Sequence, residues 1–441
     1  MQILEEAMAC WEAGRQFRKN RTRCKDFTFG RQWNEVITIG GTMMTESEYL
    51  YREGHIPLTN NLIHRIVRNI TGLFRQRFNQ LSGVNDEGKT EGDDAIMMEE
   101  LYARSFEEFL ISGMAVHKKW IGVRDGKAGV WTDMVSQNSF FYNLESRDFR
   151  GCDLEMVGEI HEIGFAEWCR EMVDSRAGWE RAKDIFSGRR HVKVVEVWRR
   201  ERRPRYLVHI PQAGSIKMVE EGEYRRNTHL QSFPSKWMLH DVWRYYFIAE
   251  DGSVLAEGDS PYVHGSHPYV MRGYPFLDGE IHSLVADMID QQKYTNRLIT
   301  VYDWIMRSSA KGVLLVPETA IDPDERENVA EQWGRFDGVI VYRPKAGVPE
   351  PRQVNADCSN PAISELLEIQ LKMLEDISGV NGALRGNLSS NSMSGTLFSQ
   401  QTENALASLQ DIFSSFASFM AECRRMDRAL RRQTLRQAWT C

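Results

Sequence analysis

The sequence has no paired cysteines and no long apolar run. Its seven cysteines are scattered and never spaced as C-x-x-C, so neither a disulfide framework nor a zinc ribbon is indicated. This usage favours synthesis in a reducing cytoplasm. No run approaches the roughly 18 to 20 apolar residues that cross a bilayer, and acidic residues interrupt the apolar start, so we expect neither a membrane span nor a signal peptide.

The sequence also lacks a positive net charge. The formal charge is −7, which argues against a protein whose whole surface grips nucleic acid, because Lys and Arg contacts to phosphate dominate such binding. A mildly acidic balance is otherwise explained by solubility. With 42% apolar and 27% charged residues, the chain has the composition of a folded globular protein.

Helical patterns dominate the last third of the chain. Apolar residues recur at helical spacing over 281–306 and again over 363–377. Between these segments, β-rich runs at 312–317 and 338–342 flank an acidic stretch at 322–333 that we expect to be helical. The region therefore predicts two helices joined by a small mixed insert.

A loop rich in Gly, Asn and Ser follows at 379–395, and it opens a long helix predicted at 396–438 from apolar positions in a near-heptad rhythm. A loop of this length is uncommon inside a compact domain, so we expect it to have a function. The alternative is a disordered surface loop.

The remainder, roughly residues 30–275, predicts an α/β body. Strands are expected where apolar and polar residues alternate, and helices where the period is near 3.6. The predicted helices cover 1–80 and 95–112, and the first range contains a break with little strand pattern at 37–42. The predicted strands lie within 115–135, which includes a hairpin at 122–127, and at 192–198, 205–210 and 243–248. The last strand runs into a turn at 250–253.

One segment matches a nucleotide-binding pattern. Residues 83–90 (GVNDEGKT) fit the phosphate-loop expression G-x-x-x-x-G-K-[ST] at every specified position. The preceding residues have helical rather than strand periodicity, however, and Asp86 and Glu87 would stand where phosphate oxygens must lie, so like charges would repel. A phosphate-loop NTPase or nucleic-acid remodelling enzyme is therefore kept only as the alternative function.

No other segment predicts catalysis or metal binding. His264 and His267 lack a third ligand at a useful spacing, and a turn explains them better. The acidic residues at 322–327 are explained by the dipole at a helix N-terminus. No catalytic triad can be assembled, so we expect no catalytic residue, no metal and no cofactor.

Several motifs occur in the order found in one family. They are residues 57–72 (PLTNNLIHRIVRNITG), 106–120 (FEEFLISGMAVHKKW), 138–143 (NSFFYN), 267–276 (HPYVMRGYPF) and 290–296 (DQQKYTN), followed by the helix, insert, helix, loop and long helix described above. In this order the chain resembles the portal proteins of tailed bacteriophages, the short-tailed phages in particular. The resemblance covers most of residues 30–435.

The resemblance implies an α+β portal architecture that forms a ring. Its parts are an N-terminal region with an α/β wing at 1–276, a first stem helix at 277–309, a clip at 310–360, a second stem helix at 361–378, a channel loop at 379–395 and a long helix on the wing or crown side at 396–441. Because the sequence stops at Cys441, we expect any further helical crown or barrel to be short or absent.

The function that the resemblance implies is that of a non-enzymatic ring, expected to hold twelve copies, at one capsid vertex. Double-stranded DNA would pass along its axis during packaging and ejection. The expected partners are further copies of the chain, the terminase, the head-to-tail adaptor and the major capsid protein, in a virion component assembled in the host cytoplasm. An acidic or mixed channel wall suits DNA passage, because it does not hold the duplex tightly. Another virion structural protein is the second alternative.

Three groups of residues are the candidate site residues. The channel loop offers amides, hydroxyls and one guanidinium for weak phosphate contacts, the stem offers polar residues between its apolar positions, and the clip offers acidic residues for partner binding. They are Asn381, Arg385, Asn387, Ser389, Ser390, Asn391 and Ser392 in the channel loop, Lys293, Asn296 and Arg297 in the stem, and Asp322, Asp324, Glu325, Glu327 and Glu331 in the clip.

Overall fold

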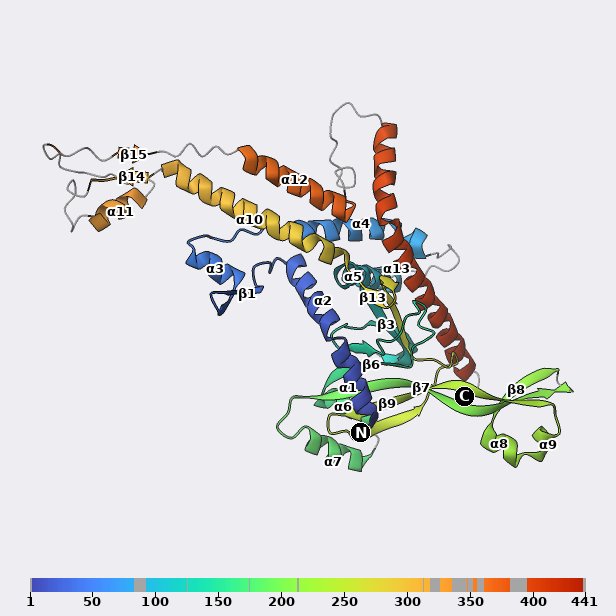
Figure 1. The fold of residues 1–441 in the computed structure, drawn as a ribbon. Helices are drawn as coiled ribbons and strands as arrows, with labels where there is room; N and C mark the ends of the chain where they lie inside the picture. Colours follow the sequence, from blue (N-terminus) through green and yellow to red (C-terminus); the bar gives the residue numbers. More distant parts are fainter. Residues whose placement is uncertain are drawn as a thin grey trace. The chain divides into compact units, whose positions relative to one another are not determined.

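The computed structural model describes residues 2–82, 93–124, 126–173, 175–211, 214–311, 313–317, 326–334, 347, 352–354, 361–380 and 395–438 (Figure 1). The fold is mixed α+β. Its contacts define two units: unit 1 comprises Met1–Thr28, His64–Asp287 and Gly379–Cys441, and unit 2 comprises Phe29–Ile63 and Met288–Ser378. Residues Phe29–Ile63 therefore group with the predicted stem, whereas the sequence patterns had placed them with the body.

Unit 1 contains most of the helices and all the large sheets. Its helices are α1 (Gln2–Ala13), α2 (Arg15–Thr28), α4 (Leu62–Ser82, whose first two residues belong to unit 2), α5 (Asp93–Ser112), α6 (Phe165–Met172), α7 (Arg176–Ile185), α8 (Glu221–Arg226), α9 (Thr228–Gln231) and α13 (Gly395–Ala438). The helices predicted at 95–112 and 396–438 are confirmed as α5 and α13.

The main sheet of unit 1 has the strand order β10-β9-β7-β6-β5, and β8 pairs with the C-terminal part of β7 (Figure 1). Its strands are β5 (Phe140–Tyr142), β6 (Met156–Gly164), β7 (His191–Ile210), β8 (Ser215–Glu220), β9 (Ser235–Ala249) and β10 (Val254–Asp259). All pairs are antiparallel, so that Val195 faces both Ile160 and Ile248 in the buried part of the sheet. The turn expected at 250–253 joins β9 to β10.

One prediction in this sheet is wrong. The runs at 192–198 and 205–210 form the single strand β7, because the charged residues between them do not break it. Arg203 pairs with Asp259 at 2.8 Å and with Glu201 at 3.2 Å, and Arg205 pairs with Glu220 at 3.3 Å. In a ribbon exposed to water on both faces, charged residues are accommodated by cross-strand pairing, which an alternation of apolar residues cannot reveal.

A smaller sheet carries the long helix α13. Strands β3 (Met114–Arg124) and β4 (Lys127–Met134) form the predicted hairpin, and β11 (Tyr269–Gly273) pairs with β3. Helix α13 packs on all three strands. Lys119 is fully buried beneath it, where its ammonium lies 2.7 Å from the Asp427 carboxylate and 2.9 Å from the Thr132 hydroxyl, so the buried charge is paired.

Aromatic rings fill the space between α13 and the helices α4 and α5. The Phe74 and Phe106 rings stack at 4.5 Å, and Phe416 of α13 meets Phe106 edge-on at 4.9 Å. All three side chains are fully buried. Buried aromatic rings contribute large apolar areas, so this cluster explains why α13 folds along unit 1 instead of standing free.

Unit 2 is built around two helices. Its elements are β1 (Val36–Ile39), β2 (Thr42–Thr45), α3 (Glu46–Arg52), α10 (Leu284–Lys311, whose first four residues belong to unit 1), β14 (Val313–Leu315), α11 (Arg326–Gly334), β15 (Arg352–Val354) and α12 (Pro361–Ser378). The chain runs along α10, reverses direction at the antiparallel pair β14–β15, and then runs back along α12 (Figure 1). The helix predicted at 361–378 is confirmed as α12.

Two sequence expectations near unit 2 need correction. The break at 37–42 is a β-hairpin, since Gly40 and Gly41 have φ of 58° and 83°, and a tight hairpin turn needs two residues with positive φ. The helix predicted from residue 277 begins at Leu284, because residues before it form the hairpin of β12 (Pro275–Leu277) and β13 (Glu280–Ile281) in unit 1.

Buried ionisable groups predict how unit 1 responds to acid. Burial lowers the pKa of His117 to about 3, below the 6.5 of an unfolded chain, so the unfolded state takes up the proton first as the pH falls. The free energy of unfolding should fall by about 1.4 kcal/mol per pH unit below 6.5 for each such histidine. His117→Gln should make this pH dependence shallower in urea titrations. Equal slopes for the wild type and His117→Gln would contradict the assignment.

Candidate functional site: the stem helices

The first part of the site is a row of buried polar side chains on α10. Gln292, Thr295, Asn296 and Thr300 are all at most 4% exposed, which is unusual for uncharged polar residues on a long helix. Gln292, Asn296 and Thr300 have hydrogen-bond partners at Gln32 and in the segment 58–63, which leads into α4, whereas the Thr295 hydroxyl has no partner among the described residues. We call the set formed by Gln32, Asn60, Gln292, Asn296 and Thr300 the polar clasp.

The polar clasp is held by hydrogen bonds to the backbone. The Gln292 side-chain oxygen accepts hydrogen bonds from the amides of Leu62 and Ile63 at 3.0 and 3.2 Å. These amides are among the first N–H groups of α4, which have no partner within that helix. The Gln292 amide nitrogen donates to the Asn60 carbonyl at 2.7 Å. A single side chain on α10 thus caps the start of α4.

Asn296 and Thr300 continue the clasp one and two turns further along α10. Asn296 accepts from the Asn60 amide at 3.1 Å and donates to the Gln32 side-chain oxygen at 2.5 Å. Thr300 accepts from the amide of Leu58 at 3.1 Å. The spacing of 292, 296 and 300 is that of one helix face, so the segment runs along this face of α10.

A second set of contacts is ionic. Lys293 lies 2.5 Å from Glu35 and 3.4 Å from Glu46, and Arg297 lies 2.5 Å from the same Glu46 carboxylate. The Glu46 side chain is only 5% exposed, and its carboxylate is paired with both cations. The ion cluster fixes the β1–β2 hairpin and α3 to α10 within unit 2.

The predicted stem residues Lys293, Asn296 and Arg297 are therefore brought together, but in contacts within the chain. Asn296 is 1% exposed and fully engaged, whereas the Arg297 side chain is 53% exposed beside its ion pair. Sequence reasoning missed Gln292 and its partners Gln32 and Asn60. The signal that was available is the repeat of amide and hydroxyl residues every fourth position on α10.

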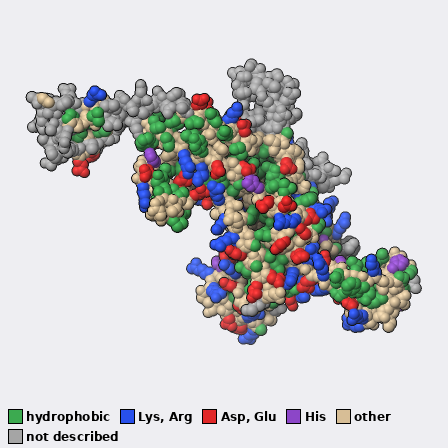
Figure 2. Space-filling view, viewed as in Figure 1, with side chains coloured by type: hydrophobic (Ala, Val, Ile, Leu, Met, Phe, Trp, Pro, Cys, Tyr) green, Lys and Arg blue, Asp and Glu red, His purple; other side chains and the backbone are tan. Residues whose placement is uncertain are grey.

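The other part of the site is apolar and exposed. On α12, Leu366, Ile369, Met373 and Ile377 follow one another at helical spacing and are 39%, 42%, 44% and 40% exposed. On α10, Tyr294, Val301 and Tyr302 are exposed to a similar degree. Figure 2 shows hydrophobic side chains gathered over α10 and α12. We call these two rows the stem stripes; exposed apolar surface of this extent marks an interaction site.

Beyond the stem, the structure covers the clip in part. Glu327 and Glu331 are exposed on α11, and β15 pairs with β14 although no strand was predicted at 352–354. Asp322, Asp324, Glu325 and the strand predicted at 338–342 lie outside the described residues. So do the phosphate-loop match at 83–90 and the channel-loop residues Asn381, Arg385, Asn387, Ser389, Ser390, Asn391 and Ser392.

His264 and His267, considered above as metal ligands, lie in unit 1. Burial lowers the pKa of His264 to about 4 and that of His267 to about 3, so both are neutral at neutral pH. No group of three or more His, Cys, Asp or Glu side chains within the described ranges could hold a metal ion. Among the helices of the described chain, none is long and apolar enough to cross a membrane.

Exposed apolar stripes on two long helices, joined by a small insert, are the features of a structural subunit that assembles with other chains. The sequence comparison agrees with this class: the model of the family "Phage P22-like portal protein" matches residues 4–426. The chain belongs to this family. No curated protein matches the sequence.

Membership establishes the general role. Portal proteins are structural, non-enzymatic components of the virion, located at the capsid vertex through which the DNA passes. The resemblance found in the sequence and the expectation of a non-enzymatic protein are confirmed by this match. The family also implies an oligomeric ring.

The clasp makes a specific prediction. In Gln292→Ala, the buried amide of Ile63 loses its acceptor, which costs about 1–3 kcal/mol, whereas the Leu62 amide keeps the Asn60 carbonyl at 2.9 Å. Hydrogen exchange at the Ile63 amide should then become about tenfold faster or more. The matched control is Gln291→Ala, which truncates the neighbouring side chain and should leave the exchange unchanged. An unaltered exchange rate in Gln292→Ala would show that this cap does not stabilise the start of α4.

Proposed function

We propose that copies of this chain close into a ring of twelve through the stem stripes, with double-stranded DNA passing along the ring axis. The observation that carries the proposal is the α12 stripe of Leu366, Ile369, Met373 and Ile377, which a single chain leaves about two-fifths exposed. Completing the burial of such side chains contributes about 1 kcal/mol each. A closed ring gains this contribution at every interface, because each copy presents the same surfaces to two neighbours.

In this proposal the parts of the chain have distinct roles. Residues 277–309 and 361–378 form the stem, and the α/β part of 1–276 together with the long helix at 396–441 forms the wing that meets the major capsid protein. The loop at 379–395 reaches the channel, where one Arg and several amides make weak contacts with DNA phosphates. Weak contacts suit this role, since tight binding would stall the DNA.

The clip at 310–360 is proposed to bind the terminase during packaging and the head-to-tail adaptor afterwards. Its described part supports an exposed, charged docking surface: β14 and β15 pair over only three residues each, and α11 presents Glu327 and Glu331 to solvent. An insert this small has little core of its own, so its stability benefits from neighbouring chains or partners.

Ring closure is tested by placing a charge in the α12 stripe. Ile369→Glu should shift the purified protein from rings to monomers or small oligomers, because burying the carboxylate in a subunit interface is unfavourable. The control Ser364→Glu adds the same charge to an exposed position outside the stripe and should leave assembly intact. Sedimentation velocity distinguishes the species. If Ile369→Glu still forms rings of unchanged size, the α12 stripe is not part of the interface between copies.

The clip assignment is tested by reversing its charges. The double variant Glu327→Lys/Glu331→Lys should still form rings but should bind terminase or adaptor roughly tenfold more weakly at low salt, with a smaller difference at high salt. Glu162→Lys/Glu167→Lys, which makes the same change of net charge at exposed positions in unit 1, is the control. Equal retention of the partner by both double variants in pull-down assays would exclude the acidic helix as the docking site.

A further inference from the structure

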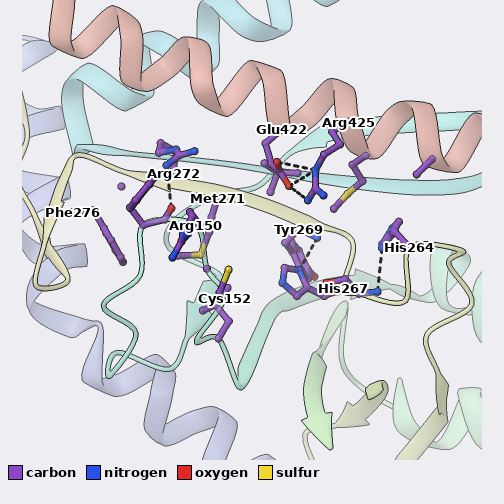
Figure 3. Close-up of a pocket in the computed structure, with 18 residues that line it drawn as sticks. Arg150, Cys152, His264, His267, Tyr269, Met271, Arg272, Phe276, Glu422 and Arg425 are labelled. Carbon is purple, nitrogen blue, oxygen red and sulfur yellow. Dashed lines mark hydrogen bonds and ion pairs between the residues drawn. The ribbon is translucent and has the colours of Figure 1, made fainter. Parts of the chain in front are cut away.

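A pocket of about 460 Å³ is lined entirely by residues of unit 1. It is formed by the loop at 149–154, strand β11, the loop at 264–267 and one face of α13 (Figure 3). Its volume is in the range of sites that take a short peptide segment or a drug-sized molecule. A DNA duplex, whose major groove alone is about 12 Å wide, is too large to enter.

The pocket has an excess of positive charge. Three arginines and one glutamate line it. The charges of two arginines are already neutralised, since Arg150 is held by Asp148 at 2.9 Å and Arg425 is held by Glu422, at 3.1 Å from its Nε. Arg272 is different, because no carboxylate among the described residues forms an ion pair with it.

Arg272 is only partly satisfied as a cation: Glu422 attracts it without forming an ion pair, and the centre of the Phe149 ring lies 5.5 Å from its guanidinium carbon. It makes one hydrogen bond, from a terminal guanidinium nitrogen to the Phe149 carbonyl at 3.1 Å, and its Nε is buried with no acceptor within the described chain. Partial burial lowers the pKa of Arg272, which means that the surroundings disfavour its charge. A half-buried guanidinium in this state is stabilised by any anion that enters the pocket.

His264 supplies a second unsatisfied donor. Its Nδ1 accepts a hydrogen bond from the Ser266 amide at 3.1 Å, so in the neutral ring the proton is on Nε2. Nε2 is buried and has no partner in the described part of the chain. The pocket therefore presents donors that lack acceptors at both Arg272 and His264.

These two donors stand apart. In Figure 3, Arg272 and His264 lie toward opposite ends of the labelled lining, and Tyr269 and the Glu422–Arg425 ion pair lie between them. The lining also includes the apolar side chains of Leu154, Phe276 and Met426. A ligand that satisfies both donors is therefore extended, with acceptor groups at its ends and an apolar group that can contact the apolar part of the lining.

We propose that this pocket binds a short acidic peptide segment of a partner protein, with carboxylates toward Arg272 and His264 and an apolar side chain against the apolar part of the lining. Charge complementarity favours an acidic segment over a basic or neutral one. The extended shape favours a peptide over a small anion, which can reach only one of the two donors.

The proposal can be tested with defined peptides, using Cys152 as a reporter. Cys152 is an exposed free thiol that lines the pocket. The peptide acetyl-Glu-Leu-Leu-Glu-amide, at millimolar concentration, should slow alkylation of Cys152 by iodoacetamide, followed at this residue by mass spectrometry. Acetyl-Gln-Leu-Leu-Gln-amide should not slow it. This comparison requires no variant, so it holds even if substitutions impair folding.

Variants then test whether a peptide carboxylate binds Arg272. Arg272→Met should weaken peptide protection at least about tenfold, because a charge-assisted hydrogen bond contributes about 1.5–3 kcal/mol. Arg428→Met, on an exposed position of α13 outside the pocket, is the matched control and should bind like the wild type. Equal protection by the acidic and the neutral peptide, no protection by either, or full protection in Arg272→Met would overturn the proposal. If citrate protects as well as the acidic peptide, the site binds small anions and the peptide assignment is wrong.

Discussion

The apolar residues on the outside of the two stem helices are the constraint on which the account depends. A helix gains most of its stability by burying one face, and α12 buries only part of its apolar surface within the chain. Leu374 is 3% exposed, whereas Ile369 and Met373, on the neighbouring face, remain 42% and 44% exposed. Such a helix is complete only when another surface covers it, and in the proposed ring this surface belongs to the next copy.

The polar clasp explains how α10 stays ordered although much of its surface is exposed. A buried amide costs free energy unless its hydrogen bonds are made, and Gln292 and Asn296 make theirs with the backbone and side chains of the segment at 29–63. Because hydrogen bonds are directional, this face of α10 has one fixed partner. In the proposed ring, assembly uses a different face of the helix, so folding of unit 2 and contact between copies would not compete for the same side chains.

Much of the fold could be predicted from the sequence where one signal dominates. The helices α12 and α13 follow from apolar periodicity, and the β3–β4 hairpin follows from alternation around a Gly-containing turn. The strand at 199–204 was missed because charged residues, such as Arg203 in its ion pair with Asp259, interrupt the apolar alternation, while the strand is held by its pairing with β9. Strand β15 was missed because three residues carry no pattern, and it exists through its pairing with β14.

The candidate site was predicted less well, for a related reason. Lys293, Asn296 and Arg297 stand out in the sequence as polar residues on an apolar helix, and this pattern fits a solvent-facing surface. Their partners Gln32, Glu35, Glu46 and Asn60 are more than 200 positions away, so only the folded chain identifies them. The stripe on α12 was visible as helical periodicity, but periodicity does not distinguish side chains buried in the chain from those left for a neighbour.

The most direct measurement is electron microscopy of the purified protein at neutral pH, with class averages viewed along the symmetry axis. The account predicts closed rings of twelve copies around a central hole, with α10 and α12 of adjacent copies in contact through the stem stripes. A population of monomers without rings at all concentrations, or rings in which the α12 stripe faces solvent, would contradict it.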